Sequence, residues 1–274
     1  MPELLCPVCG EILQQQEKSY ICGAGHSFDR AKSGYVNLLI SHQSGTQHGD
    51  DKLMVRARRE FLQKEHYAPL QKALCDAAVR YSTAQQVHLL DAGCGECYYT
   101  AAMEQALLSA GKVPHIVGFD ISKDALRFGD KRGKALRLAV ASVYHMPVAD
   151  ASCDIVVNVF APFAGEEYKR VLKPGGVLLH VSPDAEHLWE LKQAVYETPY
   201  KNDAAVPQQE GLTIEAEEKI SYPLQLSCNA DIVNLFHMTP YAHKTSPEDV
   251  ARLDALQELT VAAEFVLRVY RKEV

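Results

Sequence analysis

The 274-residue sequence contains no run of about 20 consecutive apolar residues, so no membrane-spanning helix is expected. Residues 1–10 lack the positively charged, apolar and cleavage regions of a secretory signal peptide. Positive charge is also scarce, since 28 Lys and Arg stand against 35 Asp and Glu, for a formal net charge of −7. We therefore expect a cytoplasmic protein with no membrane partner, in which any polyanion binds only where basic residues are locally concentrated.

The sequence has too few cysteines to resemble a small disulfide-stapled protein, because its eight cysteines are spread over 274 residues. Free thiols or metal ligands are expected instead. Four metal-ligand residues occur in the order Cys6, Cys9, Cys22 and His26. This C-x2-C-x12-C-x3-H spacing, with both pairs on turns joined by a hairpin, predicts a zinc-ribbon-like module. Four protein ligands fill a tetrahedral zinc ion, so the predicted role is structural; the alternative is a set of unrelated thiols and a surface histidine.

The region after this module is predicted to be a polar connection followed by a basic helix. Residues 41–51 are rich in Ser, Gly, His and Gln, which is typical of a linker or of a loop that orders on binding. Residues 54–62 have helical spacing. Four basic side chains can share its polar face: Lys52, Arg56, Arg59 and Lys64. Residues 1–75 hold nine Lys and Arg against eight Asp and Glu, whereas the remainder hold 19 against 27. This face is either a phosphate-binding surface or an ordinary solvated helix face.

A strand, a glycine loop and a helix follow in sequence. The apolar run 87–91 ends in Asp91 and turns through Gly93 and Gly95 into a helix beginning near Tyr98. Glycine tolerates positive φ and lets the backbone approach a nucleotide-like ligand closely. The pattern therefore predicts a nucleotide-type site at the carboxyl end of a first strand.

The next strands support the same fold. The run 115–120 ends in Asp120, which is 25 residues beyond Gly95 and close to the spacing that places an acid beside a ribose. Further strands are expected at 135–141, 153–159 and 177–182, alternating with helices. This alternation predicts a doubly wound parallel sheet. The alternating run 264–270 is expected to close the sheet as an antiparallel edge strand.

Several of these motifs resemble those of class I methyltransferases. They are Leu90-Asp91-Ala92-Gly93-Cys94-Gly95-Glu96, Gly118-Phe119-Asp120 and Leu172-Lys173-Pro174-Gly175-Gly176. The acid before the glycine loop favours methyltransferases over NAD enzymes. The resemblance extends to the zinc-ligand array, Gly34-Tyr35-Val36-Asn37-Leu38-Leu39, Arg58-Arg59-Glu60-Phe61-Leu62, His66-Tyr67, Glu186-His187-Leu188 and Met238-Thr239-Pro240. Together these motifs, over nearly the whole chain, are similar to the RlmA family of large-subunit ribosomal RNA guanine-N1 methyltransferases.

The resemblance implies an α/β, Rossmann-like class I methyltransferase fold with a seven-stranded, mostly parallel sheet. It implies three parts: a zinc-binding module at 1–40, a linker and helical arm at 41–82, and a methyltransferase domain at 83–274. It further implies S-adenosyl-L-methionine as methyl donor, structural Zn²⁺, and methylation of a guanine in a hairpin loop of 23S ribosomal RNA. A homodimer is left open.

The resemblance also implies roles for individual residues. Cys6, Cys9, Cys22 and His26 would bind zinc, and Tyr67, Gly95, Glu96 and His187 match positions that contact the donor. By the logic of the wider class, we add Asp91, Gly93 and Asp120. Asp120 would accept hydrogen bonds from the ribose, the two glycines would admit the amino-acid end of the donor, and Asp91 would order the loop or receive the ammonium group. Without the resemblance, Tyr67 would be interpreted as a core aromatic and His187 as a satisfied histidine.

The sequence departs from the family pattern at Cys97, which occupies the third glycine position of the loop. This thiol is either a tolerated small side chain or a cause of a narrower donor pocket. No general base is assigned, because Glu166 and Glu167 are typical first-turn helix acids. By position, residues 200–209 and 237–243 are expected to border the acceptor. The alternative functions are a small-molecule methyltransferase with a purely structural zinc clip and a catalytically silent RNA-binding module.

Overall fold

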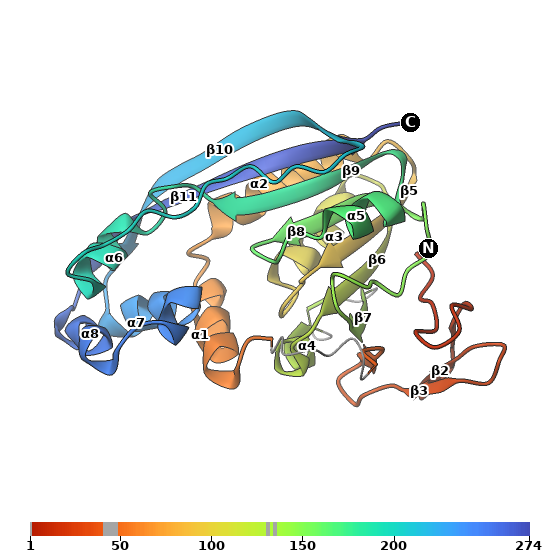
Figure 1. Cartoon of the computed structure of the whole chain (residues 1–274), viewed down its shortest axis with the longest axis horizontal. Helices are drawn as coiled ribbons and strands as arrows, with labels where there is room; N and C mark the ends of the chain where they lie inside the picture. The colour runs from red at the N-terminus through yellow and green to blue at the C-terminus, as the bar shows by residue number, and fades with distance from the viewer. Residues whose placement is uncertain (1, 41–48, 130–131, 134–135) are drawn as a thin grey trace.

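A computed structural model describes residues 2–40, 49–129, 132–133 and 136–274. Figure 1 shows a central twisted sheet with helices on both faces and the zinc-ligand module at one end. The strands are β1 (Gln14–Gln15), β2 (Ser19–Ile21), β3 (Ser27–Asp29), β4 (Val36–Asn37), β5 (Gln86–Ala92), β6 (Val113–Asp120), β7 (Leu136–Val140), β8 (Cys153–Val159), β9 (Leu172–Pro183), β10 (Leu212–Leu226) and β11 (Leu259–Lys272). The helices are α1 (Lys52–Gln63), α2 (Ala68–Tyr81), α3 (Tyr98–Ser109), α4 (Lys123–Gly129), α5 (Gly165–Val171), α6 (Trp189–Val195), α7 (Asn229–His237), α8 (Pro247–Ala251) and the 3₁₀ turns η2 (Pro240–His243) and η3 (Arg252–Ala255).

The main sheet has the order β10-β11-β9-β8-β5-β6-β7-β4. Strands β7, β6, β5, β8 and β9 run parallel to one another, as the alternation of strands and helices predicts. Successive residues of β5 point to opposite faces, so Leu89 and Leu90 are buried in different clusters. The cluster around Leu89 includes α2 and α3, whereas that around Leu90 includes α5. Because both faces are covered, these strands are apolar throughout rather than alternating.

The order of the antiparallel strands differs from the prediction for 264–270. β11 is antiparallel, but it lies between β9 and β10, and the edge strand is β10. The backbone of β11 is paired on both edges, and many side chains from Val261 to Tyr270 are buried, as is typical of an interior strand. β10 is more exposed, with a mostly polar pattern that suits an edge.

The prediction of seven strands was also wrong by one strand. β4, which comes from the segment that we assigned to the zinc-binding module, pairs in parallel with β7 through Val36–Ala139 and Asn37–Val140. Leu4 of the same module forms a bridge with Val148. Val36 and Leu4 are fully buried because they join the core on the α5 face of the sheet. The module is therefore packed on the sheet rather than merely tethered to it.

The helical arm is partly as expected. Asp51 caps α1 by accepting a hydrogen bond from the Met54 backbone amide at 2.8 Å. The four predicted basic side chains do not share one face, because Lys64 follows the end of α1 and forms an ion pair with Asp231 on α7 at 2.5 Å.

Residues 41–48 of the predicted linker lie outside the described residues. Over the described ranges, no helix has the length and apolar composition needed to cross a bilayer.

Candidate functional site

The four predicted metal ligands come together in the N-terminal module. The Sγ atoms of Cys9 and Cys22 are 3.6 Å apart, and Nδ1 of His26 is 3.4 Å from Cys22 Sγ and 3.6 Å from Cys6 Sγ. A tetrahedral zinc ion with Zn–S bonds of about 2.3 Å separates its ligand atoms by about 3.5–3.8 Å. The four ligand atoms all lie within 4.8 Å of one another, so the set fits a closed zinc site. Such a site leaves no position for a catalytic water.

The glycine loop after β5 is held by backbone hydrogen bonds to β6. The amides of Gly93 and Cys94 both donate to the Phe119 carbonyl at 2.8 Å. Gly93 has φ +91°, and a Cβ at this position would lie 2.5 Å from Cβ of Ala161. This close approach explains why glycine is required, since the loop passes directly over the end of β8.

Asp120 fixes the other side of the same loop. Its two carboxylate oxygens accept hydrogen bonds from the amides of Gly95 at 2.8 Å and Ser122 at 2.7 Å. Burial raises the pKa of Asp120, while these two hydrogen bonds lower it. A carboxylate has about four lone-pair sites, so hydroxyl groups of a bound ligand can still donate to it.

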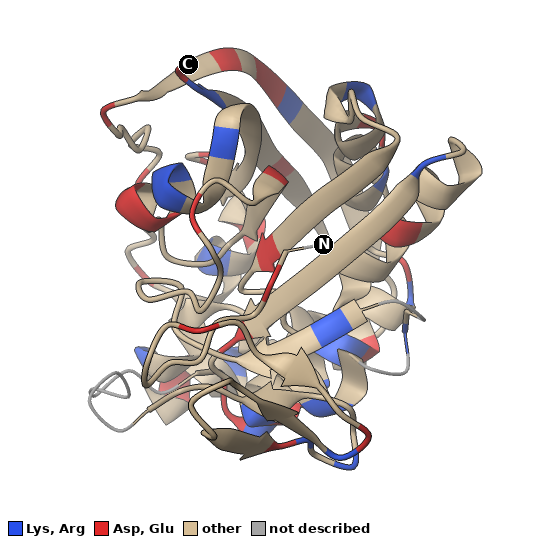
Figure 2. Ribbon diagram, turned by 90° about the vertical axis from the view of Figure 1, so that its right-hand side faces the viewer, with Lys and Arg blue, Asp and Glu red and all other residues tan. Residues whose placement is uncertain are grey.

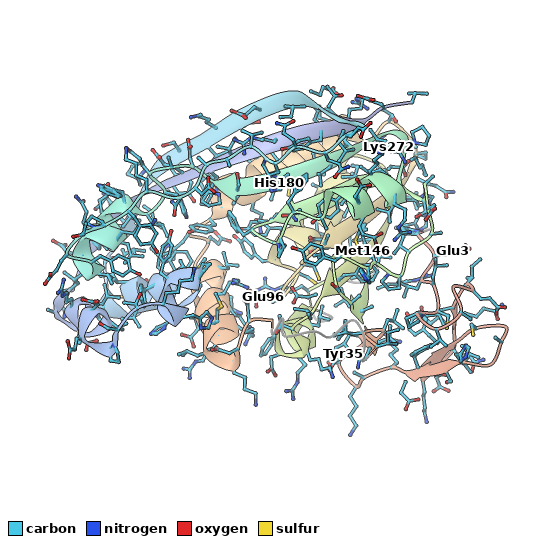
Figure 3. All side chains as sticks on the ribbon, in the orientation of Figure 1. Glu3, Tyr35, Glu96, Met146, His180 and Lys272 are labelled. Atoms are coloured by element: carbon cyan, nitrogen blue, oxygen red, sulfur yellow. The ribbon has the colours of Figure 1, made fainter. Side chains whose placement is uncertain are left out.

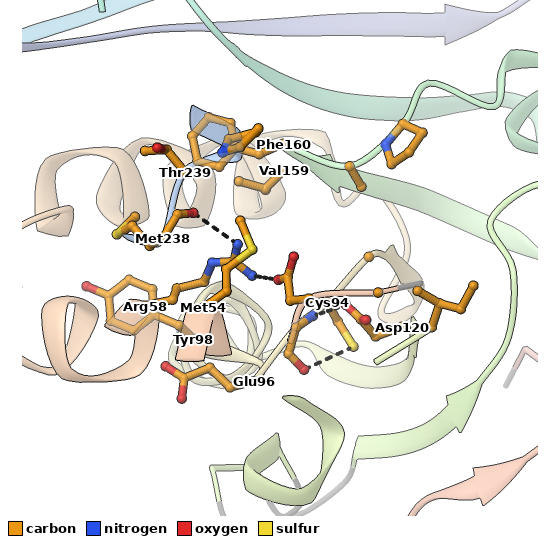
Figure 4. Close-up of a pocket in the computed structure, with 18 of the residues that line it drawn as sticks. Met54, Arg58, Cys94, Glu96, Tyr98, Asp120, Val159, Phe160, Met238 and Thr239 are labelled. Carbon is orange, nitrogen blue, oxygen red and sulfur yellow. Dashed lines mark hydrogen bonds and ion pairs between the residues drawn. The ribbon is translucent and has the colours of Figure 1, made fainter. Parts of the chain in front are cut away.

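A cavity of about 900 Å³ opens at this edge of the sheet. Its walls come from the start of α1, the loop after β5, the ends of β6, β7 and β8, and the segment after α7. Figure 4 shows Arg58 near the middle of the cavity, between Met238 and Asp120. All seven residues predicted to bind the donor line it: Tyr67, Asp91, Gly93, Gly95, Glu96, Asp120 and His187. The cavity is large enough for a drug-sized ligand.

Asp91 is buried at the base of the cavity. Thr100 Oγ1 donates a hydrogen bond to Asp91 Oδ2 at 2.5 Å, which ties the end of β5 to the first turn of α3. Burial raises the pKa of Asp91 from 3.8 to about 7, against the lowering effect of the Thr100 hydrogen bond. The folded protein therefore holds this proton more tightly than the unfolded chain does.

This raised pKa predicts a pH-dependent stability. The contribution of Asp91 is fully present below about pH 4 and is lost as the pH rises through about 7, because only the unfolded chain ionises readily in that window. In urea titrations without donor, we expect the free energy of unfolding of the wild type, relative to Asp91→Asn, to fall by a few kcal/mol between pH 4 and 8. The exposed Asp254→Asn variant should follow the wild type. Parallel curves for the wild type and Asp91→Asn would refute the assignment.

Glu96 lines the cavity, but its carboxylate is engaged by two arginines. Arg132 lies 2.7 Å from Oε1 and Arg59 lies 3.7 Å from Oε2. The side chain is 3% exposed, and burial raises its pKa while Arg132 lowers it. Figure 3 shows Glu96 close to α1. Glu96 therefore connects this cavity to α1 and to the segment after α4.

Tyr67 and His187 lie side by side above the sheet, with ring centroids 6.4 Å apart and both rings against Phe265. The Glu264 backbone amide donates to His187 Nδ1 at 3.0 Å, so the proton of the neutral ring is on Nε2. Burial lowers the pKa of His187 to about 3, which keeps the ring neutral. Two residues from distant segments thus form one aromatic wall.

Cys97 does not narrow the cavity. It is fully buried, caps α3 in the left-handed conformation with φ +62°, and is not among the described residues that line the cavity. Its Sγ would lie 2.7 Å from a Cβ at Gly129, so the thiol points toward α4. A left-handed cysteine costs about 1–2 kcal/mol, which explains why glycine suits this position.

Three further residues of the site were not predicted from the sequence: Arg58, Phe160 and Thr100. Arg58 donates hydrogen bonds to Asp50 and, at 3.3 Å, to the Met238 carbonyl. Phe160 is 45% exposed at the cavity wall with φ +58°, an outlier for an aromatic residue, and Thr100 holds Asp91. The first turn of α3 and the end of β8 gave no local signal for Thr100 and Phe160, whereas Arg58 lies in the Arg58-Arg59-Glu60-Phe61-Leu62 motif but was given no role.

Two segments were expected to border the acceptor, and the structure brings only one of them to the cavity. Met238 to Tyr241 and His243 line the cavity, whereas none of residues 200–209 is among its described lining residues. Glu166 and Glu167 are not among them either. Glu167 pairs with Arg170 at 2.7 Å, and Gln209 donates to Glu166 at 2.6 Å. These glutamates therefore stabilise α5 and its surroundings.

Comparisons with known proteins cover nearly the whole chain. A family described as "RlmA, N-terminal" matches residues 4–44, and one described as "Methyltransferase domain" matches residues 90–180. The chain is 37% identical over 300 residues to the "Putative 23S rRNA (guanine-N(1)-)-methyltransferase" of Micromonospora griseorubida, covering 99% of this chain and 98% of the relative. It is 31% identical over 274 residues to the "23S rRNA (guanine(748)-N(1))-methyltransferase" of Streptomyces fradiae, covering 96% and 95%. It is 33% identical over 268 residues to the "Putative 23S rRNA (guanine-N(1)-)-methyltransferase YxjB" of Bacillus subtilis, covering 94% and 92%.

Proposed function

The chain belongs to the family of 23S ribosomal RNA (guanine-N1)-methyltransferases, and from this membership we propose that it transfers a methyl group from S-adenosylmethionine to N1 of a guanine in 23S ribosomal RNA. The observation that carries the proposal is the cavity in which an acid, a glycine loop and a second acid meet beneath the aromatic pair Tyr67 and His187. We further propose that the target lies in a hairpin loop, because N1 of a paired guanine is inaccessible.

We propose a role toward the donor for each predicted residue that lines the cavity. Asp120 would accept bonds from the ribose hydroxyls, while Gly93 and Gly95 would let the backbone approach the amino-acid end. Asp91 would receive the ammonium group, and Glu96, held by Arg132 and Arg59, would form part of the wall beside the donor. Tyr67 and His187 would cover the donor from outside the sheet. S-adenosylmethionine supplies, when bound, an electrophilic methyl group; the protein aligns the acceptor with it.

The acceptor side of the cavity would be formed by residues after β8 and after α7. Phe160 presents an exposed ring at this wall and packs near Phe265, with centroids 5.6 Å apart and the ring planes tilted by 45°. A non-glycine residue at positive φ is strained, and such strain persists where surrounding contacts fix a functional side chain. We infer that the ring stacks on the extruded guanine.

The Phe160→Ala variant should lose this stacking. Stacking on an aromatic ring contributes about 1–3 kcal/mol per base, so we expect about a 5- to 150-fold lower kcat/KM for RNA methylation. Donor affinity should be unchanged by calorimetry, and Phe160→Tyr should retain activity. Both variants keep a Cβ, so the strain at this position is the same. Normal kinetics for Phe160→Ala would exclude the stacking role.

The reaction itself is tested with purified protein, radiolabelled S-adenosylmethionine and unmodified 23S ribosomal RNA. The expected product after nuclease digestion is labelled 1-methylguanosine. Donor binding with no label in RNA would overturn the proposal and favour the small-molecule alternative or the silent RNA-binding module.

We also propose that the protein acts in the cytoplasm, where ribosomal RNA is found. A homodimer is a further prediction, and light scattering in solution tests it.

A further inference from the structure

A second cavity, of about 760 Å³, lies on the side of α1 that faces away from the donor cavity. Its walls come from the turn before β4, from α1 and from α4. Five basic residues line it: Lys32, Lys52, Arg56, Arg59 and Arg127. We call it the basic groove. Figure 2 shows basic segments in blue around the N-terminal module at the lower end of the view.

The charge of the basic groove is opposite to that of the protein. Two acids, Glu60 and Asp124, also line it, so the lining has a net charge of +3, whereas the whole chain has −7. A concave surface of one charge concentrates counter-ions of the other charge. The groove is therefore a preferred place for a polyanion on an otherwise acidic molecule.

Several of these cations are available to a ligand. Lys32 and Lys52 are exposed and have no hydrogen bond or ion pair among the described residues. Arg56 pairs with Glu60 at 2.7 Å and Arg127 with Asp124 at 3.3 Å, with the arginine side chains 76% and 62% exposed. Exposed ion pairs within one helix are weak, so these arginines can exchange their carboxylates for phosphates.

The floor of the groove also suits a nucleic acid. The guanidinium carbon of Arg59 lies 4.4 Å from the centre of the Phe128 ring, and Val55 adds apolar surface. An aromatic ring beside guanidinium groups is the combination that binds single-stranded nucleic acid without reading its sequence. Simple phosphate ions would gain nothing from this apolar floor.

Helix α1 connects the basic groove to the donor cavity. Met54, Arg58 and Leu62 line the donor cavity at intervals of one turn, whereas Lys52, Arg56 and Arg59 line the groove. Arg59 also contacts Glu96 of the donor cavity. A chain held in the groove would therefore be separated from the donor cavity by helix α1.

We propose that the basic groove binds the sugar-phosphate backbone of the RNA substrate beside the extruded guanine. This proposal rests on the proposed function. Lys32, Lys52 and Arg56 would contact phosphates of the RNA and so position the target base, which they do not themselves contact. Lys32 belongs to the zinc-binding module, which gives that module a share in substrate binding in addition to its packing role.

The test compares Lys32→Gln/Lys52→Gln/Arg56→Gln with a control of equal charge change, Lys72→Gln/Lys201→Gln/Lys219→Gln. The control lysines are exposed and lie outside both cavities. Binding of in vitro transcribed 23S ribosomal RNA is measured by filter retention between 50 and 300 mM KCl. Each lost phosphate contact should reduce the slope of log K against log salt concentration by about 0.7–0.9. We expect the groove variant to lose about 2 units of slope and at least about 10-fold in affinity at physiological salt.

Donor affinity and melting temperature are measured on the same variants and should match the wild type. An equal loss of RNA affinity in the two triple variants would overturn the proposal, because it would show an effect of net charge alone. An unchanged slope in the groove variant would also overturn it. RNA binding is measured without methyl transfer. A failure to form 1-methylguanosine would therefore contradict the proposed function without changing the outcome of the RNA-binding test.

Discussion

The Gly93→Ala variant should bind the methyl donor at least 100-fold more weakly and lose nearly all methyl transfer. The new Cβ would lie 2.5 Å from Cβ of Ala161, closer than carbon atoms pack, and the backbone would keep φ +91° only under strain. The loop must therefore shift, which breaks the alignment of the Gly95 amide with Asp120. Calorimetric titration with S-adenosylhomocysteine measures the loss directly.

Gly175→Ala is the matched control for this prediction. Gly175 also has positive φ, at +74°, but a Cβ there would meet no atom within 4 Å, and it is not among the described residues lining the donor cavity. It should lower stability by about 1–2 kcal/mol and leave donor affinity unchanged. If both variants bound the donor normally, the close approach of the loop would have no functional role. If both lost affinity equally, general destabilisation would explain the result.

The Cys22→Ser variant should lose its zinc and nearly all RNA methylation. Apparent zinc-binding energies in small zinc modules are about 10–16 kcal/mol, which is comparable to the whole stability of a domain. Without the ion, we expect the module to unfold. Its side chains that are now buried against the sheet, among them Leu4 and Tyr20, would then become exposed. Elemental analysis gives the zinc content, and limited proteolysis reports cleavage between residues 4 and 30.

Donor affinity should fall much less than RNA methylation in this variant. The described lining of the donor cavity begins at Gly49, beyond the zinc ligands. Cys228→Ser is the control, because this exposed cysteine precedes α7, where serine is a good helix cap. A zinc-free Cys22→Ser protein that still methylated RNA at the wild-type rate would show that the module is dispensable.

The sequence by itself determined the parts of this protein whose information is local. The order of the zinc ligands depends on two turns and a hairpin, and the acids Asp91 and Asp120 stand directly at strand ends. In a parallel sheet, the carboxyl ends of neighbouring strands meet at one edge, so two local patterns were enough to predict one donor site. Tyr67 and His187 were assigned to the donor site only through the family resemblance, because neither lies at a strand end or in a glycine loop.

Only the tertiary structure decided the features that join distant segments. Three features depend on which surfaces meet. They are the pairing of β4 with β7, the position of β11 inside the sheet, and the two neighbouring arginines of α1, of which Arg58 lines the donor cavity and Arg59 the basic groove. The basic groove brings together residues as far apart as 32 and 127, which no spacing along the chain relates. The physical reason is that periodicity reports which side of an element is buried, whereas the partner of that side is chosen by packing across the whole fold.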